Sequence, residues 1–334
     1  MDLGGGGGGG ESESEANRTK LSSDDTAGKD YLSALPDDAL VVILLNLSTR
    51  DARLTVRDAH GLDNLAIHSN SLQKMELNVH GLRQLTIVAP ALEDLNVKFC
   101  FYYSRSQPVA SITAPQLGTL MWSDLYDPSS VHLGKMEHLR LLKPFVFIVY
   151  GNDSVTLNPS CLSLLWRFKV IEHLTLTLFY QQNINNNQYM MEDMTMLLDI
   201  TILHLNVIAS GHCFGASSFH VLKLCSGIRR LMLMLAEAEE QTTCPPGCIC
   251  IQQQNWETEH LLLNRLKEVE IDQFRGSEHE FTFVKQLFVW ATTLEKMTVT
   301  FDDSITESVA MELGQVLQSF SRQETRMEIA RVRI

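Results

Sequence analysis

The sequence predicts an α/β solenoid, in which short parallel strands stack and the chain returns between them. Three observations indicate this fold. An apolar triplet at offsets 0, +3 and +5 recurs along most of the 334 residues, as in LRQLTI and LEDLNV. Amphipathic segments precede several triplets in the C-terminal half. The hydrophobic content of 45% is enough to fill an extended core.

The triplet has a simple physical interpretation. Residues at +3 and +5 lie on one face of a short strand, and the first apolar residue anchors the turn that enters it. LEDLNVKFC, which Cys100 closes, is closest to the leucine-rich-repeat core L-x-x-L-x-L-x-x-N/C. The predicted triplets are Leu62/Leu65/Ile67, Leu72/Met75/Leu77, Leu82/Leu85/Ile87, Leu92/Leu95/Val97, Leu117/Leu120/Trp122, Met136/Leu139/Leu141, Ile171/Leu174/Leu176, Ile202/Leu205/Val207, Ile228/Leu231/Leu233, Leu266/Val269/Ile271 and Leu294/Met297/Val299.

The spacing of the triplets differs between the two halves. From Leu62 to Leu92 they recur every ten residues, which is shorter than a complete repeat of about 20 to 29. We therefore expect alternate triplets to lie on opposite walls of each coil, so that every second one joins the concave sheet. In the C-terminal half the intervals are about 26 to 38 residues, and we expect convex-side helices over CLSLLWRFK, MEDMTMLLDI and ASSFHVLKLC.

Two kinds of segment precede the repeats. Residues 1–29 begin with a glycine run and continue with polar and acidic residues, a composition that predicts a disordered tail. From residue 30 an amphipathic helix is predicted, with Pro36 in its first turn and an apolar stripe at i, i+3, i+4 and i+7. Ser48 followed by Asp51 predicts a capping box and a second helix, which the residues after Leu54 do not continue.

The C-terminal end predicts a βαβαβ cap that covers the apolar end of the array. Its first helix begins with a capping pair, Ser277 and Glu280, and a second pair, Ser304 and Glu307, opens a helix to about Ser319. The first helix is expected to bury Val284, Leu287, Phe288 and Ala291, and MEIARV is expected to form the last strand.

Composition limits the function. A net charge of −13 and a pI near 5.3 argue against binding nucleic acid or an anionic membrane, and favour a protein partner. No apolar run of membrane-spanning length and no secretory signal is present. The seven cysteines are odd in number and lie mostly in apolar segments, which favours a reducing compartment without disulfides. We expect a cytoplasmic or nuclear protein.

The sequence contains few candidates for chemistry. Cys244, Cys248 and Cys250 of CPPGCIC would form part of a zinc site if Cys225 or His260 supplied a fourth ligand. Because their spacing lacks a paired knuckle, we expect an irregular loop without metal. No catalytic motif is present, so we expect neither an enzyme nor a cofactor. Four histidines next to triplets are interpreted as solvated or surface-binding; they are His132, His138, His173 and His204.

An aromatic stretch, FCFYYSR, follows the triplet at Leu92. Phe99 and Phe101 are expected to pack in the core. Tyr102, Tyr103 and Arg105 are candidate substrate contacts, because Tyr and Arg are enriched among the residues that dominate binding interfaces.

Three stretches resemble the plant F-box proteins that carry leucine-rich repeats and a C-terminal FBD domain. They are DYLSALPDDALVVILLNLSTRDA, ITAPQLGTLMWSDLYDP and LKEVEIDQFRGSEHEFTFVKQLFVWATTLEKMTVTF. The resemblance implies a truncated F-box over 30–56, a leucine-rich-repeat solenoid over 57–260 and an FBD domain over 261–334. It also implies a substrate-recognition subunit of an SCF-type ubiquitin ligase, which binds an unknown protein substrate.

In this family the F-box binds a Skp-type adaptor, which joins it to a cullin scaffold. The resemblance assigns adaptor binding to residues of the first predicted helix, namely Leu35, Pro36, Leu40, Ile43, Leu44 and Leu47. The F-box is shortened here, because the chain leads from Val56 directly into the triplet at Leu62. An adaptor-independent leucine-rich-repeat module that binds the same kind of target is therefore the alternative.

Overall fold

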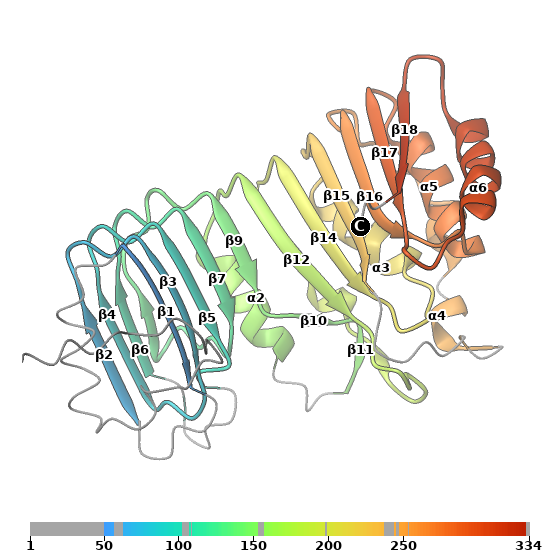
Figure 1. The fold of residues 1–334 in the computed structure, drawn as a ribbon. Helices are drawn as coiled ribbons and strands as arrows, with labels where there is room; N and C mark the ends of the chain where they lie inside the picture. The colour runs from blue at the N-terminus through green and yellow to red at the C-terminus, as the bar shows by residue number, and fades with distance from the viewer. Residues whose placement is uncertain are drawn as a thin grey trace, which may run out of the picture. The chain divides into compact units, whose positions relative to one another are not determined.

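The computed structural model describes residues 50–56, 63–101, 107, 109–152, 157–197, 199–236, 244, 247–252 and 254–331. These residues belong to one compact unit, and they form a mixed α/β fold built on a long parallel sheet (Figure 1). The predicted tail at 1–29 and the predicted helix after residue 30 lie outside the described residues.

The long sheet contains strands from both halves of the chain, and all neighbours in its main path are parallel. In spatial order they are β1 (Asp51–Val56), β3 (Lys74–Val79), β5 (Asp94–Lys98), β7 (Thr119–Ser123), β9 (Leu141–Pro144), β12 (His173–Phe179), β14 (Ile202–Ile208), β15 (Arg230–Ala236), β16 (Glu268–Phe274), β17 (Lys296–Phe301) and β18 (Arg326–Arg331). The short β10 (Phe147–Ile148) also pairs with β12, and β11 (Tyr150–Gly151) pairs with β13 (Gln188–Tyr189).

A second parallel sheet backs the first strands of the long sheet. It contains β2 (Asn64–His68), β4 (Gln84–Val88), β6 (Val109–Thr113) and β8 (Val131–Leu133). Strands alternate between the two sheets along the chain, so the triplets starting at Leu72 and Leu92 enter the long sheet and the one at Leu82 enters the second. The predicted two-walled coil is confirmed. Inward residues such as Leu85 and Leu95 are almost completely buried.

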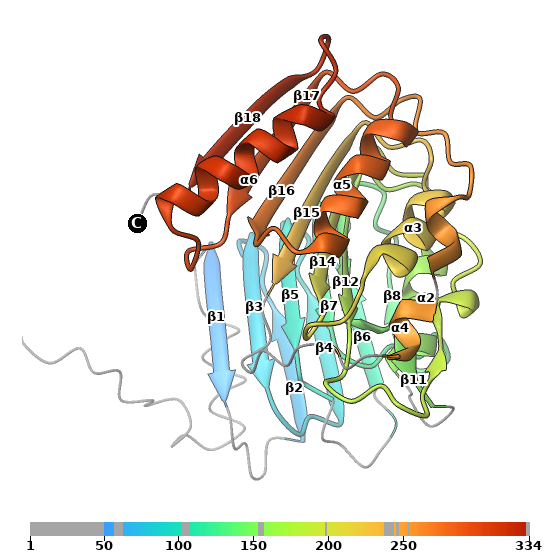
Figure 2. The ribbon, with the colours of Figure 1, turned by 90° about the vertical axis from the view of Figure 1, so that its right-hand side faces the viewer.

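Helices back most of the long sheet from β9 onward. They are α2 (Leu157–Arg167), α3 (Gly215–Leu224), α5 (Glu278–Trp290) and α6 (Glu307–Phe320), with the shorter α4 (Ile249–Gln252), η1 (Met191–Asp193) and η2 (Gln254–Glu257). Figure 2 shows α3, α5 and α6 together on one side of the sheet. Two of the three predicted helices are confirmed by α2 and α3. No helix in the described part of the chain is both long and apolar enough to span a membrane.

The helix predicted over MEDMTMLLDI is wrong, since the 3₁₀ turn η1 is the only helical turn among the described residues of this stretch. The described residues between η1 and β14 form no regular helix or strand. Asp199 makes an isolated parallel bridge with Val170, and Ile200 is buried as the residue that enters the strand. These residues therefore lead the chain into β14 and do not form a helix that covers the long sheet.

Two predicted triplets are displaced along their strands. In β9 the buried triplet is Leu139/Leu142/Pro144, because Leu142 pairs with the inward Leu120 and Leu141 points outward. In β14 it is Ile200/Leu203/Leu205, because Leu203 pairs with the inward Leu174. In both stretches several apolar residues satisfy the same spacing, and pairing with the neighbouring strand decides which ones face the core.

The second predicted helix, opening at Ser48, is also wrong. Asp51–Val56 forms β1, which pairs with β3 in register from Asp51 opposite Lys74 to Val56 opposite Val79. The β-branched residues Thr55 and Val56 favour a strand, and β3 offers a free edge for pairing. The long sheet therefore begins inside the 30–56 range assigned to the truncated F-box.

The order β16, α5, β17, α6, β18 agrees with the predicted βαβαβ pattern. The capping box of Ser277 and Glu280 is confirmed at the start of α5. The second predicted cap is wrong: Thr306 is the N-cap of α6 and makes no side-chain bond there. Ser304 instead donates from its backbone nitrogen and its hydroxyl to Asp302 Oδ1, which closes the preceding turn.

Candidate protein-binding face

The outward side chains of the long sheet form a surface that we call the open face, since none of the described helices lies on it (Figures 1 and 2). Parallel pairing in register aligns these side chains in rows across the strands. One row is Asp51, Lys74, Asp94, Thr119, Leu141, His173, Ile202, Arg230, Glu268, Lys296 and Arg326. A second row includes Arg53, Glu76, Asn96, Met121, Lys143, Thr175, His204, Met232, Glu270, Thr298 and Glu328.

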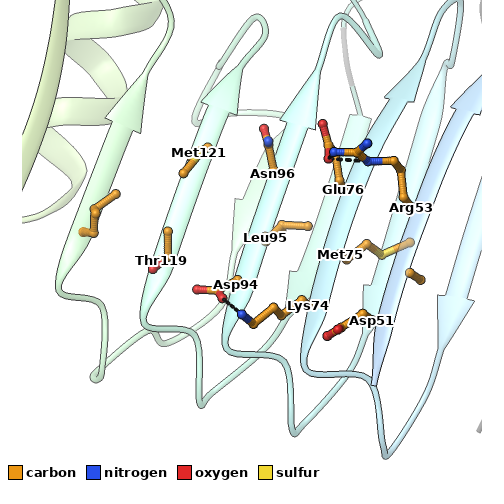
Figure 3. A pocket seen from close by; sticks show the side chains of 12 residues that line it. Asp51, Arg53, Lys74, Met75, Glu76, Asp94, Leu95, Asn96, Thr119 and Met121 are labelled. Atoms are coloured by element: carbon orange, nitrogen blue, oxygen red, sulfur yellow. Dashed lines mark hydrogen bonds and ion pairs between the residues drawn. The ribbon is translucent and has the colours of Figure 1, made fainter. Parts of the chain in front are cut away.

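Charged side chains gather at the two ends of the open face, where they pair with each other. At the β1 end, Glu76 contacts both Arg53 and Lys98. Lys74 lies 3.6 Å from Asp94, as Figure 3 shows. At the β18 end, Glu328 pairs with Lys296 at 2.8 Å and with Arg326 at 2.9 Å. The hydrogen bond and positive charge of Lys98, and to a smaller extent those of Arg53, hold the pKa of the Glu76 carboxyl below its usual value, against the opposing effect of burial.

A shallow depression of about 590 Å³ lies at the β1 end (Figure 3). Its lining comes from five neighbouring strands, β1, β3, β5, β7 and β9. Asn96 and Met121 mark the point where the paired charges give way to uncharged side chains. The Oδ1 atom of Asn96 is buried and has no hydrogen-bond partner among the described atoms.

The centre of the open face is formed by β7, β9, β12 and β14, and it is almost uncharged. Lys143 is the one Lys, Arg, Asp or Glu at the outward positions of these four described strands. Met121, Leu141 and Ile202 are half-buried, and Thr175 and Thr177 are only 6% and 7% exposed. Such a mixture of methyl, thioether and hydroxyl groups is weakly hydrated compared with the charged ends.

Two histidines lie in this centre. Burial lowers the pKa of His173 and of His204 below the ordinary value of 6.5, and for His204 the nearby His173 and Lys143 lower it further. Both imidazoles are therefore neutral near pH 7. The Nε2 atom of His173 is buried without a hydrogen-bond partner among the described atoms. His132 and His138, also singled out in the sequence, are exposed, and His138 lines the same hollow as His173.

The candidate substrate contacts Tyr102, Tyr103 and Arg105 lie outside the described residues. The preceding Phe101 is fully buried and stacks on Trp122, with ring centroids 6.3 Å apart, so its predicted core role is confirmed. Phe99 is only half-buried and makes edge contacts with His80 and Phe145.

Asp124, which follows β7, anchors the start of the Tyr102 segment. Its Oδ2 accepts a 2.9 Å hydrogen bond from the backbone nitrogen of Phe101. Burial raises the pKa of Asp124 to about 6, although its backbone donors oppose the shift. The proposed adaptor contacts, Leu35, Pro36, Leu40, Ile43, Leu44 and Leu47, lie outside the described residues.

The cysteines of CPPGCIC converge on a histidine that the sequence analysis missed. Ligand atoms of His212, Cys244, Cys248 and Cys250 all lie within 4.8 Å of one another. Neither expected fourth ligand belongs to this group. Cys225 is buried and donates to the carbonyl oxygen of Val221, and His260 is exposed.

The open face was also missed as a candidate site, although the signal was present. In each triplet the residues at +2, +4 and +6 point outward, as Lys74, Glu76 and Asn78 do in β3. Reading those positions across the triplets of the long sheet would have given part of these rows, but not at β9, where the predicted triplet is displaced. Comparison of the chain with protein-family models, with curated proteins and with solved structures finds no match.

Proposed function

We propose that this chain is the substrate-recognition subunit of an SCF-type ubiquitin ligase, and that it binds a protein target on the open face. In this proposal the strands and their backing segments are leucine-rich repeats. The β16–β18 strands with α5 and α6 form the FBD cap. The proposal combines the sequence resemblance with the composition of the open face.

The main observation behind the proposal is that the centre of the open face is almost uncharged and lies between two ends whose charged side chains form ion pairs. The cores of protein interfaces are depleted of charged residues, whereas their rims are polar. The charges at the ends already have partners within the chain. A protein segment placed across β7 to β14 would therefore desolvate few charges.

The role of such a subunit is positioning. A bound target is held near a ubiquitin-conjugating enzyme, and the high effective concentration of its lysine replaces chemistry by the subunit itself. The chain would need an adaptor, a cullin scaffold and a target, and no cofactor for catalysis. Tyr102, Tyr103 and Arg105 follow the buried Phe101 and remain proposed target contacts.

One observation favours the alternative, an adaptor-independent binding module. Asp51–Val56 forms β1 and is paired with β3, so these residues are engaged in the sheet. Only the segment before Asp51 is then available for the adaptor. A stable protein interface buries about 1,200 to 2,000 Å² in total, and one short helix contributes only part of that area.

A binding titration separates the two functions. Purified Skp-type adaptor would be titrated against this chain and against a variant in which a complete F-box is grafted before Asp51, so that β1 is kept. We expect submicromolar binding for the graft and binding at least about tenfold weaker for the chain itself.

The outcomes distinguish the proposals clearly. Measurable adaptor binding that is lost in Ile43→Asp, with Asn46→Asp as the matched control, supports the ligase subunit. No binding by the chain at tens of micromolar adaptor, while the graft binds, would assign the adaptor-independent module.

A further inference from the structure

Three thiols and one imidazole meet at a point outside the open face. His212 lies in the loop between β14 and α3, and Cys244, Cys248 and Cys250 come from the segment that leads into and through α4. The Nδ1 atom of His212 is 3.5 Å from the Sγ atoms of Cys244 and Cys248 and 3.6 Å from that of Cys250. The Sγ atoms of Cys244 and Cys250 are 3.4 Å apart.

These separations fit the corners of one tetrahedron. With Zn–S bonds of about 2.3 Å and Zn–N bonds of about 2.0 to 2.1 Å, tetrahedral geometry places nitrogen and sulfur ligands about 3.5 to 3.6 Å apart. The same geometry places two sulfur ligands about 3.8 Å apart, slightly more than the observed pair. The three nitrogen–sulfur distances thus match the edges of a site for a single ion.

The imidazole of His212 is oriented for ligation. Its Nε2 donates to the carbonyl oxygen of Gln182 at 3.1 Å, and a carbonyl can only accept. The proton of the neutral ring therefore lies on Nε2, and Nδ1 presents its lone pair to the sulfurs. A hydrogen bond from the second ring nitrogen to a backbone carbonyl is a common arrangement for metal-binding histidines. The ring also stacks on the buried Tyr180, with centroids 6.1 Å apart.

The local backbone directs the ligands inward. Ser210 and Gly211 both have positive φ, at 48° and 80°, and the resulting turn sends the His212 side chain into the protein. Gly247 has a φ of 80° and reverses the chain just before Cys248. His212, Cys248 and Cys250 are only 2% to 3% exposed. Cys244 is half-buried and closes the group toward the surface.

We propose that His212, Cys244, Cys248 and Cys250 bind one Zn²⁺ in a closed structural site. Four protein ligands of the Cys₃His type fill the tetrahedral coordination, so no position is open for a catalytic water. This proposal replaces the expectation that the loop holds no metal. The sequence shows no paired knuckle because the fourth ligand is His212, which lies 32 residues before Cys244.

A bound ion would link α4 to the loop after β14. It would thereby hold in place the segment after α4 that packs on α3 and α5. Trp256, six residues after Cys250, packs on Phe283 and Trp290 of α5, with centroids 6.0 Å and 5.9 Å away. Its ring also fills the space beside Gly215 at the start of α3, where a Cβ atom would come within 2.2 Å of it. Holding Cys250 in place therefore also holds the Trp256 segment in its position between α3 and α5.

The test begins with the metal content of the full chain, purified under reducing conditions without chelator and reconstituted with zinc. We expect about one zinc per chain, and a melting temperature at least about 5 °C lower after the metal is removed. Exchange with Co²⁺ should give the absorption of a tetrahedral ion with thiolate-to-cobalt charge transfer. These measurements use the unmodified chain, so they remain informative even if a substitution prevents folding.

Variants then assign the ligands. Cys248→Ser should lower the zinc content severalfold, and His212→Cys should keep it by making a Cys₄ site. Cys225→Ser and His260→Ala are the controls, because both residues were plausible from the sequence and neither joins the group. Zinc below about 0.2 equivalents after reconstitution, an octahedral cobalt spectrum, or full zinc content in Cys248→Ser would overturn the proposal. A Cys244–Cys250 disulfide in the freshly reduced protein would overturn it as well.

Discussion

The first crossovers of the long sheet, from β1 to β9, contain the strands of a second sheet, whereas most crossovers after β9 contain helices. The connections explain the difference. Between β3 and β5 the chain has only residues 80–93, which contain β4. Between β16 and β17 it has residues 275–295, which contain α5. Parallel strands need a crossover of about a dozen residues or more, and the shorter crossovers here contain an extended strand in place of a helix.

The open face continues across both halves in spite of this change of backing. β12 pairs with β9 on one side and with β14 on the other, so the rows of outward residues pass from one half to the other without a break. The backing thus changes along the sheet while the face continues. The two halves share this face, and the proposed target site lies where they meet.

The largest expected effect concerns the helical backing. Phe288 of α5 is 4% exposed, and Phe288→Ala should lower the free energy of unfolding by about 3 to 5 kcal/mol, because it leaves a large cavity. Chemical denaturation would measure it. The neighbouring Val289 is 59% exposed, so Val289→Ala is the matched control, with an expected change within about 0.5 kcal/mol. A loss below about 1 kcal/mol for Phe288→Ala would show that α5 does not back the sheet as described.

The second sheet should matter almost as much in the first half. Leu85 of β4 is fully buried, and Leu85→Ala should cost about 2 to 5 kcal/mol. Gln84→Ala on the same strand is exposed and serves as the control. If Leu85→Ala left the free energy of unfolding nearly unchanged, β4 would be only loosely attached to the long sheet. The second sheet would then not be a backing layer equivalent to the helices.

Helix caps give a smaller difference within the helical half. Ser277→Ala removes the capping box of α5 and should cost about 1 kcal/mol. Thr306→Ala at the start of α6 should cost clearly less, since the Thr306 side chain makes no capping bond. Thermal unfolding of both variants measures the difference. Equal losses would contradict the assigned N-caps.

The smallest effect concerns pH at the junction of the halves. The pKa of His204 is lower in the folded chain than the unfolded value of about 6.5, so the unfolded state binds more protons as the pH falls below that value. Stability from the neutral His204 is therefore present above about pH 6.5 and is lost on acidification through the folded pKa. Burial is the main cause, and His173 and Lys143 add to it, against Asp272 and Glu270.

Denaturation at pH 7.5 and at pH 5.5 tests this sign. His204→Gln should reduce the loss of stability between the two values relative to the original chain. Comparing variants removes the contribution of other groups, including Asp124, whose raised pKa acts in the opposite direction. An unchanged pH dependence in His204→Gln would contradict the assigned burial.

Much of the architecture followed from local patterns. The ten-residue spacing from Leu62 to Leu92 predicted alternate walls, and the pair Ser277 and Glu280 predicted the start of α5. Both signals are strong because few other arrangements satisfy them. The failures occurred where several arrangements fit the local sequence. Leu141 and Leu142 satisfy the triplet spacing equally well, and only pairing with β7 selects Leu142 as the inward residue.

Long-range contacts were outside the reach of the sequence pattern. A capping pair at Ser48 and Asp51 looked helical, but pairing with β3 makes that segment a strand. The grouping of His212 with three distant cysteines depends on how the loop after β14 meets α4, which no local spacing encodes. The rows of the open face likewise appear only when the strands are aligned.

Partner enrichment can test whether the junction of the two halves binds a protein, as proposed. Tagged chain would enrich partners from extract, with quantitative mass spectrometry, for the original chain and three variants. Met121→Glu and Met232→Glu place a charge in or beside the uncharged centre, and Thr300→Glu places the same charge near the β18 end. All three should keep the original melting temperature.

We expect at least one enriched protein to fall about tenfold or more with both methionine variants and to be retained with Thr300→Glu. The loss follows from burying an unpaired carboxylate in the interface core. Enrichment of the same proteins at the same level by all four chains would show that the centre of the open face does not bind them.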